Sequence, residues 1–392
     1  MNTAAHADVH ARYLDAAATA PLRPEALAAM LSVYEAGPGN PSSVHTAGHR
    51  TAGVVDRARQ RIADTFGVRP AEVVFTAGGT EANNLAIIGL ALANPRGKHL
   101  VTTAIEHPSV IESCRFLERV HGFELTFVEV DADGRVVPEH LTEVVRPDTT
   151  LVSIGLANAE VGTVQDVPGL AEVVRDRGAL MHTDAVQAAA SLPVSLAADG
   201  WPGVGVDALT VASHKFGGPQ GVGALIVRQH LALEPLLHGG GQERGLRSGT
   251  ENVAGIAGFA AAVVAARTGV GSHAIALMQS RDALVARVQG EVPGARLTGH
   301  ASERLPGHAS FVIEGISGES VLVALDTVGF AVSSGSACAA GHDEPSPALL
   351  AMGVSPQLAQ TAIRFTLHRP LDPDDLDRVV RVIARESAPA RR

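Results

Sequence analysis

Lys215 is one of only two lysines in the 392-residue chain, and Lys98 is the other. It follows a predicted strand over Asp207–Ala212 and precedes a turn-forming sequence, FGGP, at residues 216–219. A lysine at the end of such a strand lies at the carboxyl edge of the sheet, where open α/β folds bind ligands. Lysine is also the side chain that forms Schiff bases. The position indicates a covalent cofactor site, and the alternative is a solvated surface lysine.

Two further side chains with acid–base chemistry also follow predicted strands. Asp184 ends the strand Leu180–Asp184, 31 residues before Lys215. A carboxylate there could pair with the ring nitrogen of a pyridine cofactor and keep the ring protonated. The alternative is the N-cap of a helix. His107 follows the strand His99–Thr103, so its imidazole could stack on a cofactor ring or could be a core or capping histidine.

A glycine turn joins a predicted strand to a predicted helix at residues 76–81 (TAGGTE). Small residues there let backbone N–H groups at the helix N-terminus approach an anion such as a phosphate. The alternative is an ordinary tight turn. The order of glycine turn, histidine, aspartate and lysine, each after a strand, is more specific than any one of these signals.

The elements that must position these side chains alternate between short strands and helices. Such alternation indicates the α/β class, with a mostly parallel sheet covered by helices on both faces. The predicted strands are Glu72–Thr76, His99–Thr103, Leu125–Val130, Leu151–Gly155, Leu180–Asp184, Asp207–Ala212 and Gly223–Arg228, and the helices between them are Thr80–Ala93 with a threonine cap, Pro108–His121 and Pro168–Arg177.

The pattern changes after the glycine-rich run His238–Gly245. We predict a large domain over residues 13–264 and a smaller α+β domain over residues 265–392, with residues 1–30 packing on the smaller one. The elements expected in this part are helices over Asn252–Arg267 and Ser272–Gln289, and short strands over Ala309–Ile313, Ala331–Ser333 and Ala362–Leu367.

Composition argues against several classes of function. The formal net charge of −10 argues against direct binding of nucleic acid, which needs a basic surface. No stretch approaches the roughly 20 apolar residues of a membrane span, and we expect no signal peptide and no membrane partner. The chain has only two cysteines, Cys114 and Cys338, which excludes a disulfide framework and indicates a reducing cytoplasm.

Motifs along most of the chain carry a resemblance to a known family, from residues 13–15 (YLD) to about Phe365. The sequence resembles the cysteine desulfurases of the NifS/IscS type, within the class V aminotransferase-like, fold-type I pyridoxal-phosphate enzymes. That resemblance implies a seven-stranded large-domain sheet. The other matching segments are GNPSS at 39–43, TAGGTEANN at 76–84, TDAVQ at 183–187, SHKFGGPQGVGAL at 213–225, HGGGQERGLRSGTEN at 238–252, SSGSAC at 333–338 and IRFTL at 363–367.

The resemblance implies a role for each matching residue. Lys215 would hold pyridoxal 5'-phosphate as a Schiff base, Asp184 would pair with the pyridinium nitrogen, and His107 would stack on the ring and help move protons. Arg364 would bind the substrate carboxylate, and Asn40 would touch the substrate. The remaining implied cofactor contacts are Gln187 with the ring hydroxyl, Gly79, Thr80 and His214 with the phosphate, and Thr250 with the phosphate of the neighbouring subunit of a homodimer.

Cys338 matches the nucleophile of the family. Its thiolate would take the sulfur of L-cysteine as a persulfide, L-alanine would be released, and the sulfur would pass to an acceptor. A reactive thiol needs exposure, and the small, polar residues of Val332–Pro347, with the cysteine loop at 333–347, predict an exposed loop. The acceptor could be an iron–sulfur scaffold or a thiolation enzyme, and DNA phosphorothioation is also supplied in this way. Cys114 lies in a predicted helix and is expected to be structural.

Two positions depart from the pattern of the family. Ala159 stands where close relatives carry an asparagine that contacts the cofactor, and Ala212 stands where many carry a phosphate-binding serine. The neighbours Asn158 and Ser213 are candidate cofactor contacts that could compensate, although consecutive residues of a strand point to opposite faces. The alternative functions are a selenocysteine lyase, another lyase or an aminotransferase of the same fold, or a weakly active paralogue that serves as a scaffold.

Overall fold

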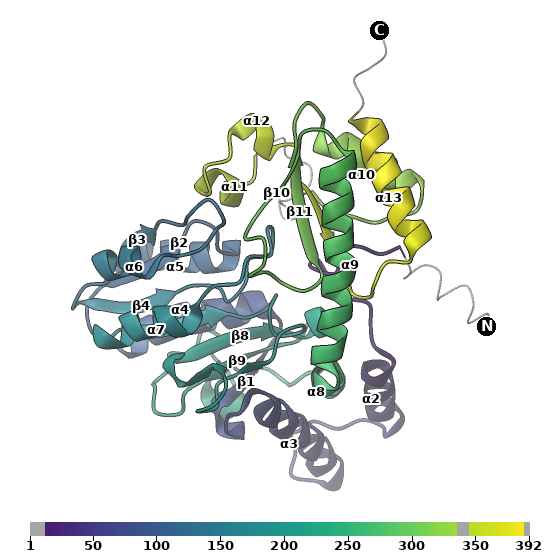
Figure 1. The fold of residues 1–392 in the computed structure, drawn as a ribbon. Helices are drawn as coiled ribbons and strands as arrows, with labels where there is room; N and C mark the ends of the chain where they lie inside the picture. Colours follow the sequence, from purple (N-terminus) through teal and green to yellow (C-terminus); the bar gives the residue numbers. More distant parts are fainter. Residues whose placement is uncertain (1–11, 335–344, 388–392) are drawn as a thin grey trace.

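The computed structural model describes residues 12–334 and 345–387 of the chain. Its larger part is built on a seven-stranded sheet of order β1-β9-β8-β5-β4-β2-β3 (Figure 1). The neighbours from β8 to β3 are parallel, and β9 is antiparallel to both of its neighbours, which confirms the mostly parallel sheet. The strands are β1 (Val73–Thr76), β2 (His99–Thr103), β3 (Glu124–Val128), β4 (Thr149–Ser153), β5 (Leu180–Asp184), β8 (Ala208–Ala212) and β9 (Gly223–Val227).

Helices cover both faces of this sheet, which is why its central strands read as continuous apolar runs. Successive side chains of β1 alternate between the faces. Val73 and Phe75 belong to one apolar core, and Val74 belongs to another. The first core is completed by α3 (Thr46–Phe66), α7 (Val167–Asp176) and α8 (Val253–Arg267), and the second by α4 (Gly79–Ala93) and α5 (Pro108–His121).

The predicted threonine cap of the helix after β1 is wrong. α4 begins at Gly79, its N-cap is Gly78, and no side chain of the described residues caps it. Gly79 is needed there because a Cβ at this position would come within 2.9 Å of Val186 Cγ2. The first N–H groups of a helix have no partner within the helix, so this uncapped end stays open to an anion.

A smaller three-stranded antiparallel sheet has its own apolar core. The predicted strand at Ala331–Ser333 is present only as isolated bridges, from Ala331 to Tyr13 and from Ser333 to Arg364. The domain boundary at residue 264 stays a prediction. The sheet comprises β10 (Ala295–Leu297), β11 (His308–Ile313) and β12 (Ile363–Thr366), and its core includes residues of α9 (Val270–Glu291), α10 (Gly318–Thr327) and α13 (Pro373–Glu386).

The N-terminal segment, residues 12–23, connects the two sheets. Ala16 N donates to Thr366 O at 3.1 Å, beside the small sheet, and Ala20 N donates to His214 O at 2.9 Å, beside the large one. The segment therefore passes directly over the turn that carries Lys215. It leads into α2 (Pro24–Glu35), which packs on α8.

The remaining described elements are short. They are α6 (Pro138–Val144), α11 (Pro347–Ala351), α12 (Pro356–Ala359), the two-stranded pair β6 (Val194–Ser195) and β7 (Trp201–Pro202), and the 3-10 turns η1 (Pro70–Glu72), η2 (Gly203–Gly205), η3 (Ser213–Phe216) and η4 (Glu243–Gly245).

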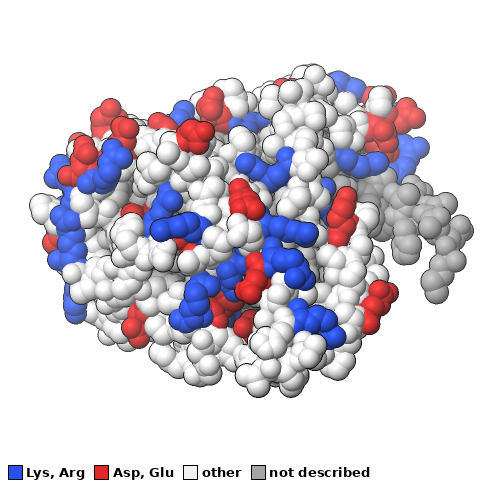
Figure 2. All heavy atoms as spheres, turned by 90° about the horizontal axis from the view of Figure 1, so that it is seen from below, with Lys and Arg blue, Asp and Glu red and all other residues white. Residues whose placement is uncertain are grey.

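Charged side chains of both signs are interspersed on the face shown in Figure 2. This face therefore carries no unbroken basic field of the kind that binds phosphate backbones. Within residues 12–334 and 345–387, no single helix is long and apolar enough to cross a membrane. Only α8 and α9 together, bent by 72°, have that length and composition.

Candidate active site

A cavity of about 610 Å³ lies at the carboxyl edge of the large sheet. It brings together the predicted residues that follow β1, β2, β5 and β8, because the parallel strands all end at this edge. The residues predicted for the site that line it are Gly79, Thr80, His107, Asn158, Asp184, Gln187, His214, Lys215 and Arg364.

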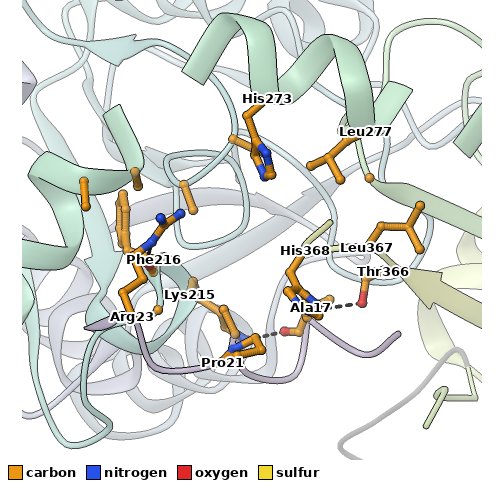
Figure 3. A pocket seen from close by; sticks show the side chains of 18 of the residues that line it. Ala17, Pro21, Arg23, Lys215, Phe216, His273, Leu277, Thr366, Leu367 and His368 are labelled. Carbon is orange, nitrogen blue, oxygen red and sulfur yellow. Dashed lines mark hydrogen bonds between the residues drawn. The ribbon is translucent and has the colours of Figure 1, made fainter. Parts of the chain in front are cut away.

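Lys215 is not a solvated surface lysine. It stands in η3, and its Nζ donates to Ala18 O at 2.8 Å and also to Ala17 O, both in the N-terminal segment. Figure 3 shows this side chain beside Ala17 and Pro21, where the three residues line a second cavity of about 640 Å³. Lys215 and Gln187 line both cavities. The amine therefore lies where the N-terminal segment separates two hollow spaces.

Asp184 presents its carboxylate to the cavity from the end of β5. Its Oδ2 accepts from Asn83 Nδ2 at 2.7 Å, and its Oδ1 accepts from Val186 N at 2.9 Å. The bond to Val186 N lies within a turn and no described helix begins at Asp184, so the capping alternative does not hold, and the pairing with a ring nitrogen stays a prediction. Two N–H donors hold this carboxylate in a defined orientation at the cavity wall.

His107 lines the cavity and is also the N-cap of α5, so the capping alternative holds as well. Its Nδ1 accepts from Ser109 N at 3.1 Å and lies 2.7 Å from Ser109 Oγ. Burial lowers the pKa of His107, nearby Asp184 raises it, and Lys215 lowers it further. The imidazole is therefore held mainly in its neutral form.

Arg364 extends from β12 of the small sheet into the same cavity, and it is only 2% exposed. Its Nη2 donates to Asp15 Oδ1 at 2.8 Å, and its Nη1 donates to Ala159 O at 3.1 Å. Its buried Nε has no hydrogen-bond partner within the part of the chain that the structure describes. A guanidinium held in this way still has a donor for the carboxylate of a ligand.

The open end of α4 forms one end of the cavity. A further hollow of about 560 Å³ is lined by Gly78, Gly79, Thr80 and His214, so these residues surround one space. Burial, with a contribution from Lys215, lowers the pKa of His214 to about 4, which keeps its ring neutral. The His214 ring can therefore accept or donate a hydrogen bond without adding a charge.

Ser213 does not reach the cavity, which corrects its predicted role. Its hydroxyl is buried without a hydrogen-bond partner among the described residues, and a Cβ on Gly218 would lie 2.3 Å from it. The reason is the alternation of side chains at the end of β8, because Ala212 is the residue that faces the cavity. Ser213 therefore cannot replace a hydroxyl at position 212.

Asn158 lines the cavity, but its amide is engaged in its own loop. Its Nδ2 donates to Ile105 O at 2.7 Å, and its Oδ1 accepts from the backbone N–H groups of Glu160 and Val161 at 2.8 and 3.0 Å. Both lone pairs of the amide oxygen are thus used within the chain. We interpret Asn158 as a residue that shapes the cavity wall, and its role as a cofactor contact stays a prediction.

Besides Ser213, two more of the described predicted residues are not brought to the cavity. Asn40 and Thr250 are exposed and line neither of the two large cavities, so their roles stay predictions. Cys338 lies outside the described residues. Cys114 is buried in α5, and burial raises the pKa of its thiol to about 12, as suits a structural cysteine.

Sequence reasoning missed the residues that hold the predicted ones in place. Asn83 and Asp15 lie inside the quoted motifs TAGGTEANN and YLD, but nothing in those motifs indicated their partners. Glu106 is half-buried, and its carboxyl group accepts from Thr103 Oγ1 at 2.8 Å and from Gly155 N at 2.9 Å. Burial outweighs these bonds and raises the pKa of Glu106 to about 7.

Glu106→Gln is expected to flatten the pH dependence of the free energy of unfolding between about pH 4.5 and pH 7. In that window the folded protein keeps the Glu106 proton, whereas the unfolded chain releases it near its ordinary value of 4.5. The contribution of Glu106 to the free energy of unfolding is therefore complete below pH 4.5 and is lost as the pH rises to 7. It amounts to about 3 kcal/mol. Urea unfolding at a series of pH values measures this, with the exposed Glu118→Gln as the control. An identical slope in wild type and Glu106→Gln would contradict the assignment.

Pyridoxal phosphate suits the set of groups that surrounds the cavity. The uncapped N-terminus of α4 offers N–H groups to a phosphate, the Asp184 carboxylate suits a protonated ring nitrogen, and the Lys215 amine suits a covalent link. The unpartnered Nε of Arg364 adds a donor for the carboxylate of an amino acid. These residues fit the cofactor.

Comparisons with known proteins agree with this arrangement. The aminotransferase class-V family model matches residues 12–379. The "Cysteine desulfurase IscS" of Dictyoglomus turgidum is 42% identical over 374 residues, which cover 95% of this chain and 93% of that protein. The structure of a "NifS-like protein" has a TM-score of 0.87 at 35% identity, covering 95% of this chain and 98% of the other. The structure "SspA in complex with cysteine" has a TM-score of 0.79 at 32% identity, covering 92% and 100%.

The family match spans nearly all of the described residues, and the fold and motifs agree with it. The chain therefore belongs to the aminotransferase class-V family of pyridoxal-phosphate-dependent enzymes and, within it, to the cysteine desulfurases of the NifS/IscS type.

Proposed function

We propose that this protein removes sulfur from L-cysteine with pyridoxal 5'-phosphate, releases L-alanine and leaves a persulfide on Cys338. The observation that carries this proposal is the convergence of Lys215, Asp184 and His107 with the partly unpaired guanidinium of Arg364 on one cavity. This set can bind both the cofactor and the carboxylate of an amino acid.

The residues that would hold the cofactor follow from the cavity. Lys215 would attach it covalently, Asp184 would keep its ring nitrogen protonated, and Gln187 would contact the ring hydroxyl. Gly79 and Thr80, at the start of α4, would bind the phosphate together with His214. When bound, the cofactor acts as an electron sink for bonds at the α-carbon of the substrate.

The chain's own groups would then bind and orient the substrate. Arg364 would bind the substrate carboxylate, and Asp15 and Ala159 O hold the guanidinium while it does so. Lys215 Nζ and the His107 ring would move protons at the α-carbon and at the thiol. The overall change is balanced, since L-cysteine and the Cys338 thiol give L-alanine and a Cys338 persulfide.

A homodimer and a sulfur acceptor belong to the same proposal. Thr250 is exposed on the loop after η4 and is available to reach the phosphate of a neighbouring subunit. Exposed apolar side chains on α2, namely Leu27, Leu31 and Tyr34, support a second copy of the chain as the partner. The acceptor would be a protein, either an iron–sulfur scaffold or a thiolation enzyme, and the site of action would be the cytoplasm. No nucleic acid and no membrane would take part directly.

Cys338→Ala is expected to abolish formation of alanine and sulfide from L-cysteine while the protein still turns yellow with cofactor. The reason is that the substitution removes the proposed sulfur acceptor and keeps the residues proposed to bind the cofactor. The measurement follows alanine, sulfide and the visible spectrum. Cys114→Ala is the matched control, because the buried Cys114 thiol has a pKa of about 12 and cannot act as a thiolate.

Other results of this assay on wild type and Cys338→Ala would each indicate a different function. Alanine released by Cys338→Ala as fast as by wild type would indicate another lyase, and keto acid formed instead of alanine would indicate an aminotransferase. A strong preference for L-selenocysteine would indicate a selenocysteine lyase. Wild type that neither binds cofactor nor reacts would indicate a scaffold paralogue, with Ala159 and Ala212 as the reason.

A further inference from the structure

The side chain of Asn83 lies between two residues of the cavity wall and is 1% exposed. Its Nδ2 donates to Asp184 Oδ2 at 2.7 Å and to Ser109 Oγ at 2.9 Å. An ionised carboxylate can only accept hydrogen bonds, so Asp184 determines which end of the amide faces it. The Nδ2 group therefore stands between Asp184 and Ser109, and both of its hydrogens are used.

This orientation of Asn83 also determines the direction of the next hydrogen bond. Ser109 Oγ already accepts a hydrogen from Asn83, so its own hydrogen is free to donate to His107 Nδ1 at 2.7 Å. Ser109 N donates to the same Nδ1 at 3.1 Å. A ring nitrogen that accepts in this way carries no proton, so the proton of the neutral imidazole is on Nε2.

We propose that Asn83 and Ser109 are positioning residues that use the charge of Asp184 to hold His107 as its Nε2–H tautomer with a defined ring orientation. This inference rests on the proposed function only in giving His107 a part in proton transfer. A chain of hydrogen bonds runs from Asp184 through Asn83 and Ser109 to His107, so one carboxylate serves both the cofactor and the imidazole. Neither Asn83 nor Ser109 lies at the end of a strand, where the predicted site residues were found.

The two charged groups nearest His107 act on its pKa in opposite directions. Lys215 from η3 disfavours an imidazolium, and Asp184 from β5 favours it. Glu106, the preceding residue, directs its carboxyl group to Thr103 and Gly155, and Arg364 lines the same cavity. Protonation of His107 Nδ1 would place a new N–H group opposite two other donors, the backbone N–H and the hydroxyl of Ser109, and both hydrogen bonds to Nδ1 would be lost. The hydroxyl of Ser109 thus helps to keep the ring neutral.

The Ser109 hydroxyl and the Asn83 amide are not needed to cap α5. His107 caps α5 through the backbone N–H of Ser109, and that bond does not require a side chain at position 109. The neighbouring Asn84 is a natural comparison, because it is half-buried and its Nδ2 donates to Thr80 O, within the same helix, at 2.8 Å. Asn84→Ala therefore removes an amide from α4 without touching the cavity wall.

The test uses holoenzyme labelled with ¹⁵N-histidine, with the His107 signals assigned through His107→Gln. In wild type we expect the Nε2–H tautomer across the neutral range. In Ser109→Ala we expect a higher pKa for His107, loss of the single tautomer, and an acidic limb of kcat/KM that moves to higher pH. The loss in kcat should be roughly tenfold, as for one hydrogen bond, with little change in KM. Ser109→Thr should restore the wild-type signals, and Asn84→Ala should not change them.

Two results separate this inference from the proposed function. Unchanged His107 signals and an unchanged acidic limb in Ser109→Ala would overturn the inference, even if the enzyme were fully active. A tautomer that depends on Ser109 in a protein without desulfurase activity would support the inference and refute the function. Asn83→Ala should repeat the effect of Ser109→Ala, and if it does not fold, Ser109→Ala alone decides.

Discussion

Lys215→Ala is expected to lower the rate of alanine formation from L-cysteine by about a thousandfold or more, the scale seen when a covalent catalytic group is removed. The Nζ of Lys215 lies at the junction of the two cavities and bonds to backbone oxygens of the N-terminal segment. No other lysine is available to replace it, because the sequence contains only Lys98 besides. Removing the amine also removes the only side chain at the site that can link the cofactor covalently.

The scarcity of lysine makes the measurement unusually direct. Borohydride reduction of the holoenzyme, followed by digestion and mass spectrometry, should place the cofactor on the peptide that contains Lys215. Lys98→Ala is the matched control, since that lysine is exposed, its Nζ donates to His121 O at 2.8 Å, and it precedes β2 at the sheet edge opposite the site. Cofactor found on Lys98, or a Lys215→Ala protein that retains full activity and a covalent cofactor, would refute the assignment.

Glu243→Gln is expected to destabilise the fold by about 3–5 kcal/mol, the usual result of breaking a buried ion pair from one side. Arg59 donates to both oxygens of Glu243, through Nη1 and Nη2, at 2.7 Å each. Phe75 N donates to the same carboxylate at 2.9 Å, so one side chain joins α3, β1 and η4. Both members of the pair are buried, and the substitution leaves the charge of Arg59 without its partner.

The backbone at η4 adds to the expected effect. Glu243 and Arg244 both have positive φ, at 48° and 59°, which is uncommon for residues other than glycine. The carboxylate bonds hold this turn, and the turn leads to the loop that carries Thr250. We therefore expect weaker cofactor binding together with the loss of stability.

Chemical unfolding at fixed protein concentration measures the change. Glu124→Gln is the control, because Arg146 donates to both oxygens of Glu124 in the same bidentate arrangement at an exposed position. The exposed pair should have a much smaller effect, since solvent screens it. Equal effects of the two substitutions would show that burial is not the source of the stabilisation.

The elements of the large sheet could be predicted from local patterns. The strands His99–Thr103 and Leu180–Asp184 and the helix Pro108–His121 have the predicted bounds, because short apolar runs and a proline at a helix start are local signals. The threonine cap of α4 was wrong because a glycine turn can end a strand and begin a helix without any side-chain cap. The helices α2 and α3 received no prediction.

In the candidate site, too, local signals identified some residues and did not identify others. Lys215, Asp184 and His107 were identifiable because each follows a strand, and the ends of parallel strands meet. The partners that hold them were not identifiable: Asp15 and Arg364 are 349 positions apart, and Asn83 and Asp184 are 101 apart. Such pairs leave no periodic signal in the sequence.

By itself, therefore, the sequence determined which residue types stand at the sheet edge and the chemistry they can perform. Only the tertiary structure decided which residues orient them, that the Ser213 hydroxyl turns away from the cavity, and that Asn83 links Asp184 to Ser109. The physical reason is that the period of a strand or helix is a local property of the chain, whereas a hydrogen bond between distant residues depends on how the packed elements bring them together.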